Sequence, residues 1–81
     1  MGGILEPGVA FGRVVRRLRQ NAGLTQEQLA FEAELRRTYV SILELGQQQP
    51  SLATILKLAA AFKLPARDLI GLVENELNTS D

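Results

Sequence analysis

The side chains best suited to chemistry lie in the stretch ELRRTYVSIL, residues 34–43 of this 81-residue chain. It places two arginines, a threonine, a tyrosine and a serine among residues that belong in a hydrophobic core. The chain has neither cysteine nor histidine, so the usual zinc ligands are missing and catalysis would rest on carboxylates, lysine, tyrosine or hydroxyls. No glycine-rich phosphate loop, paired-acid motif or nucleophile elbow is present. These residues therefore favour recognition through hydrogen bonds, and we expect no enzyme activity, catalytic residue, metal or cofactor.

Within this stretch, Val40 and Leu43 have the spacing of core residues on a helix from Arg37 to about Leu45. With Leu35 buried in the preceding turn, roughly half of the helix circumference is left for solvent or a partner. The residues on that face and its leading end are Arg36, Arg37, Thr38, Tyr39, Ser41 and Ile42.

The composition of this face suits double-stranded DNA. A major groove about 12 Å wide admits one helix, and residues at the N-terminal end of that helix reach base edges. Arginine can bind guanine through two hydrogen bonds, and threonine or isoleucine can contact a thymine methyl group. Tyrosine and serine hydroxyls suit phosphate or base acceptors. Two of these residues have a second interpretation, because Tyr39 could pack its ring in the protein and Ile42 could serve a protein contact.

The remaining segments must position this helix, and their periodicity is helical throughout, which predicts an all-α chain. A first helix is expected from about Val9 to Asn21. A second runs from about Gln26 to Ala33, and it begins with a capping box formed by Thr25 and Gln28. A fourth helix follows the cap Ser51, and a fifth covers about Ala66 to Leu77, after the break at Leu64-Pro65. The expected inward stripe of the fourth helix is Leu52, Ile55, Leu56, Ala59 and Phe62.

Residues 1–8 read as a flexible leader, residues 9–77 as one domain and residues 78–81 as a polar tail. The second and third helices, about residues 25–44, are joined by a short turn and make a helix-turn-helix. At its start, Thr25 and Gln26 offer free backbone N–H groups to a phosphate.

The fifth helix carries more apolar residues than one stripe can use. Some of them would form an exposed patch unless a second chain covers it. We therefore expect a homodimer with Ile70, Val73 and Leu77 in the contact. A dimer also suits a symmetric operator, which needs two recognition helices about 34 Å apart.

The charge balance favours an alternative. Nine basic and nine acidic residues give no net charge and a pI of about 6.2, whereas nucleic-acid-binding domains typically have a pI above about 9. The alternative is a protein-binding, antitoxin-like module on the same fold, which would dock a partner through Ile42 and Leu45.

The runs LTQEQLAFEAELRRTYVSILELG and PSLATILKLAAAFKLPARDLI resemble the Cro/C1-type (Xre) helix-turn-helix family of transcription regulators. Within that family the sequence is most similar to the short controller proteins of restriction–modification systems. The likeness spans roughly residues 9 to 72. It implies a five-helix, lambda-repressor-like DNA-binding domain that acts as a dimer in the cytoplasm of a bacterial or phage-infected cell. It also implies RNA polymerase as a further candidate partner, with no membrane association and no small-molecule effector.

The resemblance also implies roles for single residues. Gln26 matches the glutamine that contacts backbone phosphate, and we add Thr25, Ser41 and Gln48 as phosphate contacts. The family positions that reach bases or nearby phosphates match Arg37, Thr38 and Tyr39, with Ile42 one turn further along the same face. We add Arg36 as a base-reading residue. Arg19 and Glu44 match a partly buried salt bridge that ties the first helix to the recognition helix.

Two departures from the family pattern stand out. Glu34 occupies the turn where the family usually has glycine, often in a left-handed conformation, so either the turn differs or strain is tolerated. Leu45 and residues 47–49 stand where the family often has arginine, lysine or asparagine. Fewer basic groups near the DNA backbone predict modest affinity per subunit, which makes dimerisation important.

Overall fold

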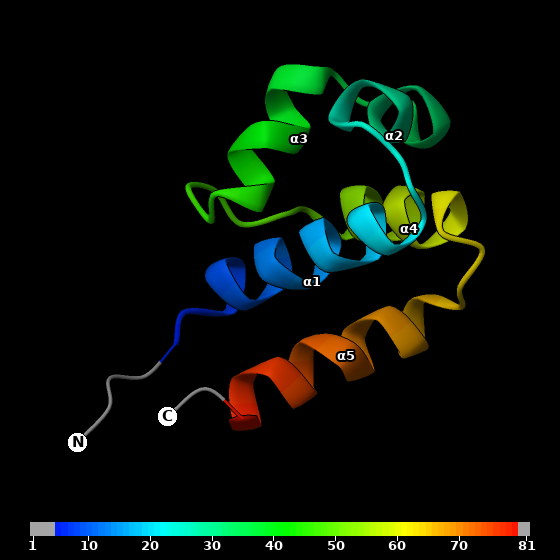
Figure 1. Cartoon of the computed structure of the whole chain (residues 1–81). Helices are drawn as coiled ribbons and strands as arrows, with labels where there is room; N and C mark the ends of the chain where they lie inside the picture. Colours follow the sequence, from blue (N-terminus) through cyan, green and yellow to red (C-terminus); the bar gives the residue numbers. More distant parts are fainter. Residues whose placement is uncertain (1–4, 80–81) are drawn as a thin grey trace.

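The computed structural model describes residues 5–79, and every regular element within them is a helix. The helices are α1 (Pro7–Asn21), α2 (Gln26–Ala33), α3 (Arg37–Glu44), α4 (Leu52–Ala61) and α5 (Ala66–Thr79). The prediction of an all-α, five-helix chain is confirmed. Figure 1 shows α1 running between the α2–α3 pair on one side and α5 on the other. Among the described residues, no helix combines the length and the apolar character needed to cross a membrane.

The ends of three helices differ from the predictions. α1 begins at Pro7, two residues early, because proline has no N–H to leave unpaired at the first helical position. Pro7 and Gly8 are therefore helical and do not belong to the predicted leader, whose residues 1–4 lie outside the described residues. α3 ends at Glu44, with Leu45 as its cap, and α5 continues into the predicted tail as far as Thr79.

The start of α2 is held as predicted. The Thr25 hydroxyl oxygen accepts a hydrogen bond from the backbone N–H of Gln28 at 3.0 Å. The Gln28 side-chain oxygen in turn accepts from the backbone N–H of Thr25 at 2.8 Å. This reciprocal pair satisfies two of the N–H groups that a helix start leaves free. It fixes the first turn of α2, where Gln26 lies.

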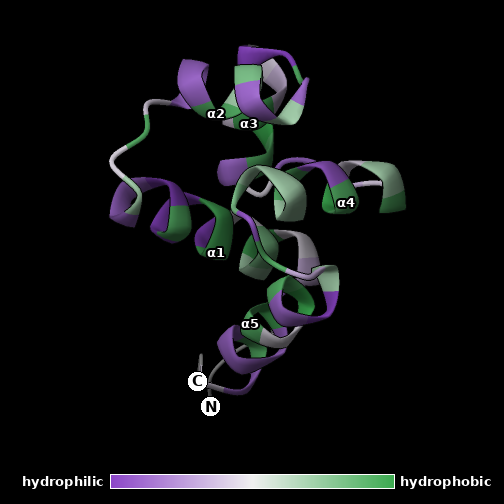
Figure 2. Cartoon of the chain, turned by 90° about the vertical axis from the view of Figure 1, so that its right-hand side faces the viewer, coloured by the Kyte–Doolittle hydropathy of each residue, from purple (hydrophilic) through white to green (hydrophobic). Residues whose placement is uncertain are grey.

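The core is aliphatic except for Phe11 and lies between all five helices. α1 packs against α3 and α5, while α2 packs against α3 and α4. Figure 2 shows hydrophobic segments of α1, α4 and α5 meeting near the centre, with hydrophilic segments at the periphery. The largest fully buried side chains are Val14, Val15, Leu29, Val40, Leu43, Leu58 and Leu69.

The predicted stripe of α4 is wrong at two positions. Leu52 is 71% exposed and Leu56 is 50% exposed, whereas Leu58 and Ala59 are buried. α4 is apolar nearly all round, so two helical phases satisfy the same spacing rule. The contacts with α2 and α5 select the phase that buries Leu58, which leaves Leu52 and Leu56 on the surface.

α1 meets α3 at Gly12. A β-carbon at this position would overlap the carbonyl oxygen of Leu43 and would lie 2.9 Å from the carbonyl oxygen of Glu44. The two backbones can therefore approach only because residue 12 is glycine. This close crossing sets where the C-terminal end of α3 lies relative to α1.

Candidate nucleic-acid interface

The turn between α2 and α3 consists of residues 34–36. Glu34 has φ 57° and ψ 44°, so a non-glycine residue adopts the left-handed conformation here. The backbone N–H of Leu35 donates to the carbonyl oxygen of Ala30 at 2.8 Å, and its side chain packs against the core. Of the two possibilities that the sequence left open, the strain at Glu34 is tolerated and the turn keeps its shape.

This turn brings four predicted DNA-contacting residues together from two helices. Gln26 of α2 and Arg37, Thr38 and Ser41 of α3 line one small hollow of about 150 Å³. Arg37 and Thr38 are exposed, while Gln26 and Ser41 are half-buried. A hollow lined by hydrogen-bonding side chains and one arginine, beside the first turns of two helices, suits an anionic ligand such as a phosphate.

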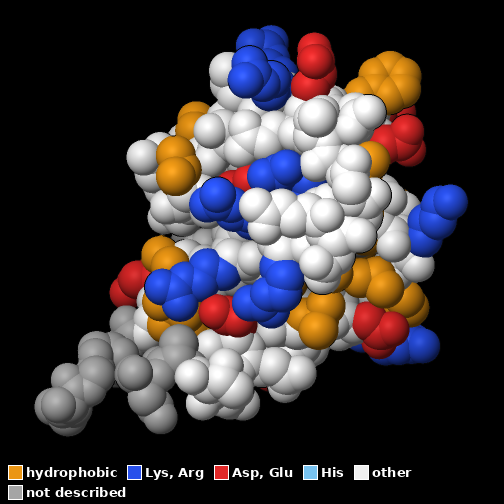
Figure 3. All heavy atoms as spheres, in the orientation of Figure 1, with side chains coloured by type: hydrophobic (Ala, Val, Ile, Leu, Met, Phe, Trp, Pro, Cys, Tyr) orange, Lys and Arg blue, Asp and Glu red, His pale blue; other side chains and the backbone are white. Residues whose placement is uncertain are grey.

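Two arginines at the start of α3 have a positive charge that no carboxylate of the described residues neutralises through an ion pair. Arg36 is the N-terminal cap residue and Arg37 is the first helical residue, and both side chains are exposed. Within residues 5–79, neither one pairs with a carboxylate. Figure 3 shows Lys and Arg side chains gathered at the top of the molecule, where Figure 1 draws the α2–α3 end.

Tyr39 turns toward α4. Its hydroxyl lies 3.3 Å from the hydroxyl oxygen of Thr54, and its ring packs against the core. The structure therefore agrees with the packing interpretation of Tyr39, with a protein hydroxyl as the partner. Any contact of Tyr39 with DNA would have to share or replace this hydrogen bond. Ile42, one turn from Thr38 on the same helix, is half-buried.

The ion pair predicted between Arg19 and Glu44 is present and joins α1 to α3. Arg19 Nε donates to Glu44 Oε2 at 2.6 Å, and Arg19 Nη2 donates to Glu44 Oε1 at 3.0 Å. The third guanidinium nitrogen, Nη1, donates to the carbonyl oxygen of Leu24 at 2.9 Å. The Arg19 side chain is 13% exposed and that of Glu44 only 3%. The hydrogen bond to Glu44 raises the pKa of Arg19 above its already high value, although burial opposes it.

Glu44 also holds a residue that the sequence did not link to it. Gln26 Nε2 donates to Glu44 Oε1 at 3.0 Å. The two residues are 18 positions apart and meet only because α2 and α3 cross, so no local pattern could have revealed the bond. Sequence reasoning found each residue but assigned the two to separate roles.

The two other predicted phosphate contacts, Thr25 and Gln48, lie in different environments. The Thr25 hydroxyl oxygen accepts within the capping box, which leaves its hydrogen free to donate. Gln48 is exposed in the loop after α3. Because an eight-residue helix is about 12 Å long, Gln48 lies at the far end of α3 from the Gln26 hollow.

The predicted dimer residues of α5 do not share one environment. Ile70 is 38% exposed and Leu77 is half-buried, but Val73 is 8% exposed and belongs to the core of the single chain. Val73 can therefore offer little surface to a second chain. The structure instead exposes Leu52 and Leu56 of α4, which the sequence had assigned to the core. The sequence signal for this exposure was that α4 is apolar nearly all round, so some of its apolar residues had to face outward.

Two basic residues of α1, Arg13 and Arg17, pair with a glutamate of α5. Glu76 Oε1 accepts from Arg17 Nη2 at 2.5 Å, and Glu76 Oε2 lies 3.6 Å from Arg13 Nη1. The hydrogen bond from Arg17, helped by Arg13, lowers the pKa of Glu76. In Figure 3, acidic side chains lie beside Lys and Arg side chains both in the lower half of the molecule and at the top, but among the described residues the basic side chains that form ion pairs are Arg13, Arg17, Arg19 and Arg67. The α3 arginines therefore provide the less neutralised cationic surface.

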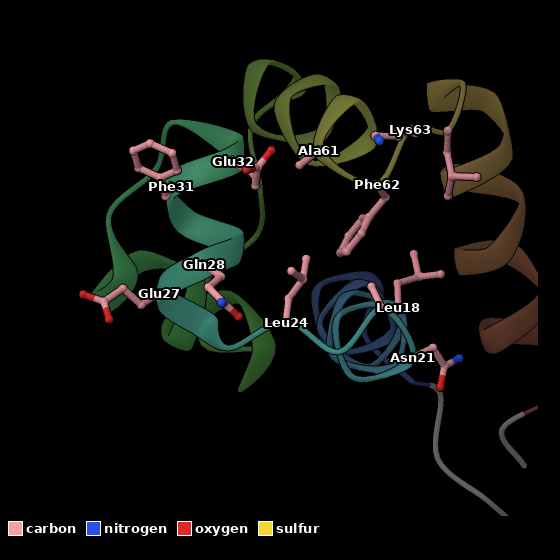
Figure 4. Close-up of a pocket in the computed structure, with 12 residues that line it drawn as sticks. Leu18, Asn21, Leu24, Glu27, Gln28, Phe31, Glu32, Ala61, Phe62 and Lys63 are labelled. Atoms are coloured by element: carbon pink, nitrogen blue, oxygen red, sulfur yellow. The ribbon is translucent and has the colours of Figure 1, made fainter.

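A larger groove of about 980 Å³ lies on the opposite side of α2 from Gln26. Figure 4 shows Leu18, Leu24 and Phe62 lining it, with Phe31 at its rim pointing away from the interior. Phe31 is 81% exposed, and Glu27 and Glu32 place negative charge on the α2 wall. The lining has two carboxylates, Glu27 and Glu32, against one lysine, Lys63, so the groove disfavours phosphate and is not part of the candidate DNA surface.

The chain is similar in sequence and fold to known helix-turn-helix proteins. The sequence profile of the helix-turn-helix family matches residues 15–69. The chain is 41% identical over 61 residues to the control protein C.BamHI from Bacillus amyloliquefaciens, which covers 74% of this chain and 75% of that protein.

Two solved structures are also similar. The restriction–modification controller protein C.AhdI from Aeromonas hydrophila is 48% identical, with a TM-score of 0.73 over 76% of this chain and 94% of that chain. The controller protein C.Esp1396I, solved as a tetramer with its natural 35-base-pair operator, is 20% identical, with a TM-score of 0.84 over 93% of this chain and 99% of that chain. The latter likeness concerns the fold alone.

Proposed function

Because this chain belongs to the Cro/C1-type helix-turn-helix family of transcriptional regulators, we propose that it binds double-stranded operator DNA as a homodimer. α3 enters the major groove with its N-terminal end toward the bases. Arg37 and Thr38 read base edges, with Arg36 beside them and Ile42 one turn further along. Gln26, Thr25 and Ser41 contact phosphates of the same groove.

The observation that carries this proposal is the hollow shared by Gln26, Arg37, Thr38 and Ser41. It joins two exposed, partly polar helix starts beside arginines that pair with no carboxylate of residues 5–79. A site of this kind attracts phosphate and gives the protein a fixed register on the duplex. Its polar groups are too few and too open to form an enclosed catalytic pocket.

Dimerisation is proposed through three exposed apolar residues of α4 and α5, Leu52, Leu56 and Ile70, together with the half-buried Leu77. Burial of apolar surface contributes roughly 25 cal/mol per Å², which favours covering such residues with a second copy. Two copies related by a twofold axis can present two α3 helices about 34 Å apart to a symmetric operator.

By analogy with the controller proteins that it resembles, the dimer acts in the cytoplasm near a promoter, where it competes with or recruits RNA polymerase. The zero net charge supports moderate affinity, since binding to phosphates scales with the number of Lys and Arg contacts. Occupancy then depends on protein concentration through dimerisation.

The test is selection of bound sequences from a random duplex library at low salt. We expect the wild type to enrich a twofold-symmetric site. Arg37→Ala should lose one base preference in each half-site, at a cost of about 1–3 kcal/mol. The control is Arg67→Ala, which removes the same charge from a side chain that is 87% exposed on α5. It should select the wild-type site.

The protein-binding alternative draws support from two exposed apolar residues, Leu45 at the C-terminal cap of α3 and Phe31 at the rim of the larger groove, which are 62% and 81% exposed. Folded wild-type protein that enriches no sequence would favour this alternative. The search would then turn to a protein partner of these residues and Ile42.

A further inference from the structure

We propose that Glu44 is a positioning residue for DNA binding, which fixes the side-chain amide of Gln26 so that one N–H of that amide faces a DNA phosphate. This inference rests on the proposed function and deepens it. Glu44 does not contact DNA itself, because its side chain is 3% exposed. It acts through Gln26, which is half-buried and lines the hollow between α2 and α3.

The direction of the Gln26 amide follows from the chemistry of its partner. Both oxygens of Glu44 already accept hydrogen bonds from Arg19, and Oε1 accepts a further one from Gln26 Nε2. A carboxylate paired with a guanidinium can only accept hydrogen bonds. The amide must therefore face Glu44 with its nitrogen, since a flipped amide would place two oxygen atoms against each other.

The orientation leaves one donor for DNA. An amide nitrogen carries two hydrogens, and Glu44 uses one of them. The second remains for an acceptor in the hollow, where Arg37 supplies positive charge. An unrestrained glutamine at this position would present its carbonyl oxygen to the phosphate part of the time, which is repulsive. Glu44 removes this unproductive orientation before DNA arrives.

The ion pair with Arg19 also explains why the Glu44 carboxylate can lie close to a DNA-binding surface. A bare anion there would repel phosphates, but the Arg19 guanidinium neutralises it through two hydrogen bonds. The group that reaches the surface is neutral Gln26. The ion pair therefore has two separable effects: it ties α1 to α3, and it orients an amide on α2.

The experiment uses the operator selected by the wild-type protein, with a neutral methylphosphonate placed at one phosphate at a time. For the wild type, one position per half-site should weaken binding about tenfold, as expected for loss of a hydrogen bond to a charged group. Gln26→Met keeps the length of the side chain without its donors. It should bind the unmodified operator more weakly and lose the sensitivity at that one position.

Three further variants separate positioning from stability. Glu44→Asp keeps a charge for Arg19 but is too short to hold both partners. Arg19→Met/Glu44→Leu replaces the buried pair by apolar residues, a change that is often neutral or stabilising. Glu27→Gln makes a carboxylate-to-amide change at an exposed neighbour of Gln26, as a control for charge alone. Folding of each variant is checked by circular dichroism and thermal unfolding.

If Glu44 positions Gln26, a methylphosphonate at the phosphate that Gln26 contacts should weaken binding of Glu44→Asp and of the double variant by only about twofold or less. Methylphosphonates at the other phosphates should have the same effects as in the wild type. For Glu27→Gln, the methylphosphonate at the Gln26 phosphate should still weaken binding about tenfold. Folded Glu44 variants that retain the tenfold effect would overturn this inference and leave the proposed function standing. Folded wild-type protein that selects no duplex would overturn the proposed function, and this inference with it.

Discussion

Gly12 lies against the carbonyl oxygen of Leu43, so that the backbones of α1 and α3 touch where the two helices cross. The crossing holds the C-terminal end of α3 in place, including Glu44, the last residue of that helix. The position of the DNA-facing helix is therefore set by a contact in which one residue has no side chain.

The first prediction concerns this crossing. Gly12→Ala places a methyl group on two carbonyl oxygens and should destabilise the fold by about 3 kcal/mol or more, because backbone atoms cannot move aside. Gly71→Ala is the matched control, because its β-carbon would meet nothing within 4 Å in the middle of α5. That change should stabilise by about 0.5–1 kcal/mol. Urea unfolding of both variants checks the pair, and equal effects would contradict the account of the crossing.

The second prediction concerns the left-handed residues. Glu34 and Lys63 have φ of 57° and 60°, a conformation that costs a non-glycine residue about 1–2 kcal/mol. Glu34→Gly and Lys63→Gly should each raise the free energy of unfolding by about 1 kcal/mol. Glu32→Gly, at an exposed position inside α2, should lower it by a similar amount. Thermal unfolding measures all three, and a destabilised Glu34→Gly would refute the strain at the turn.

The third prediction concerns pH. Arg17 holds the pKa of Glu76 below its ordinary value, so ionised Glu76 stabilises the folded chain. This contribution is complete above the pKa of about 4.3 of a glutamate in the unfolded chain, and it is lost as the pH falls through the lowered folded value.

Glu76→Gln should therefore be less stable than the wild type at neutral pH, and the difference should shrink as the solution becomes more acidic. Unfolding curves collected from neutral to strongly acidic pH test this expectation. Glu74→Gln, exposed on the same helix, should show a smaller difference. A gap between wild type and Glu76→Gln that is constant with pH would exclude the ion pair as its cause.

The fourth prediction concerns assembly. Leu56→Glu places a charge among the exposed apolar residues of α4 and should convert a dimer into a folded monomer. Phe31→Glu makes the same kind of change at a residue that is 81% exposed on α2, away from the proposed contact, and should leave the dimer intact. Sedimentation equilibrium measures whether each variant is a monomer or a dimer. If Phe31→Glu alone dissociated the dimer, the contact would have to be placed on α2.

Local patterns in the sequence predicted much of this fold. The capping box of Thr25 and Gln28 lies within four residues, so it could be recognised without any tertiary structure. The clustering of Arg37 and Thr38 beside Gln26 followed once α2 and α3 were recognised as a helix-turn-helix. In these cases the deciding interactions are local, or are fixed by a short turn.

The predictions that failed depend on contacts between distant helices. The helical spacing of α4 allows either Leu52 or Leu58 to face the protein core. Only packing of α4 against α2 and α5 determines that Leu58 is the buried one. The exposure of Val73 depends on the same kind of contact, because α5 has apolar residues on more than one face and packing within the chain leaves Val73 only 8% exposed. The hydrogen bond between Gln26 and Glu44 depends on the angle at which two helices cross, which the sequence does not encode locally.

The setting of Tyr39 also provides an optical probe. The chain has one tyrosine and no tryptophan, so its ultraviolet emission comes from a single ring lodged between α3 and α4. Phenol emission responds to hydrogen bonding of the hydroxyl, and here the partner is Thr54. A shift of α3 on meeting a duplex would therefore change the fluorescence of the unlabelled protein, and Tyr39→Phe would supply the dark reference.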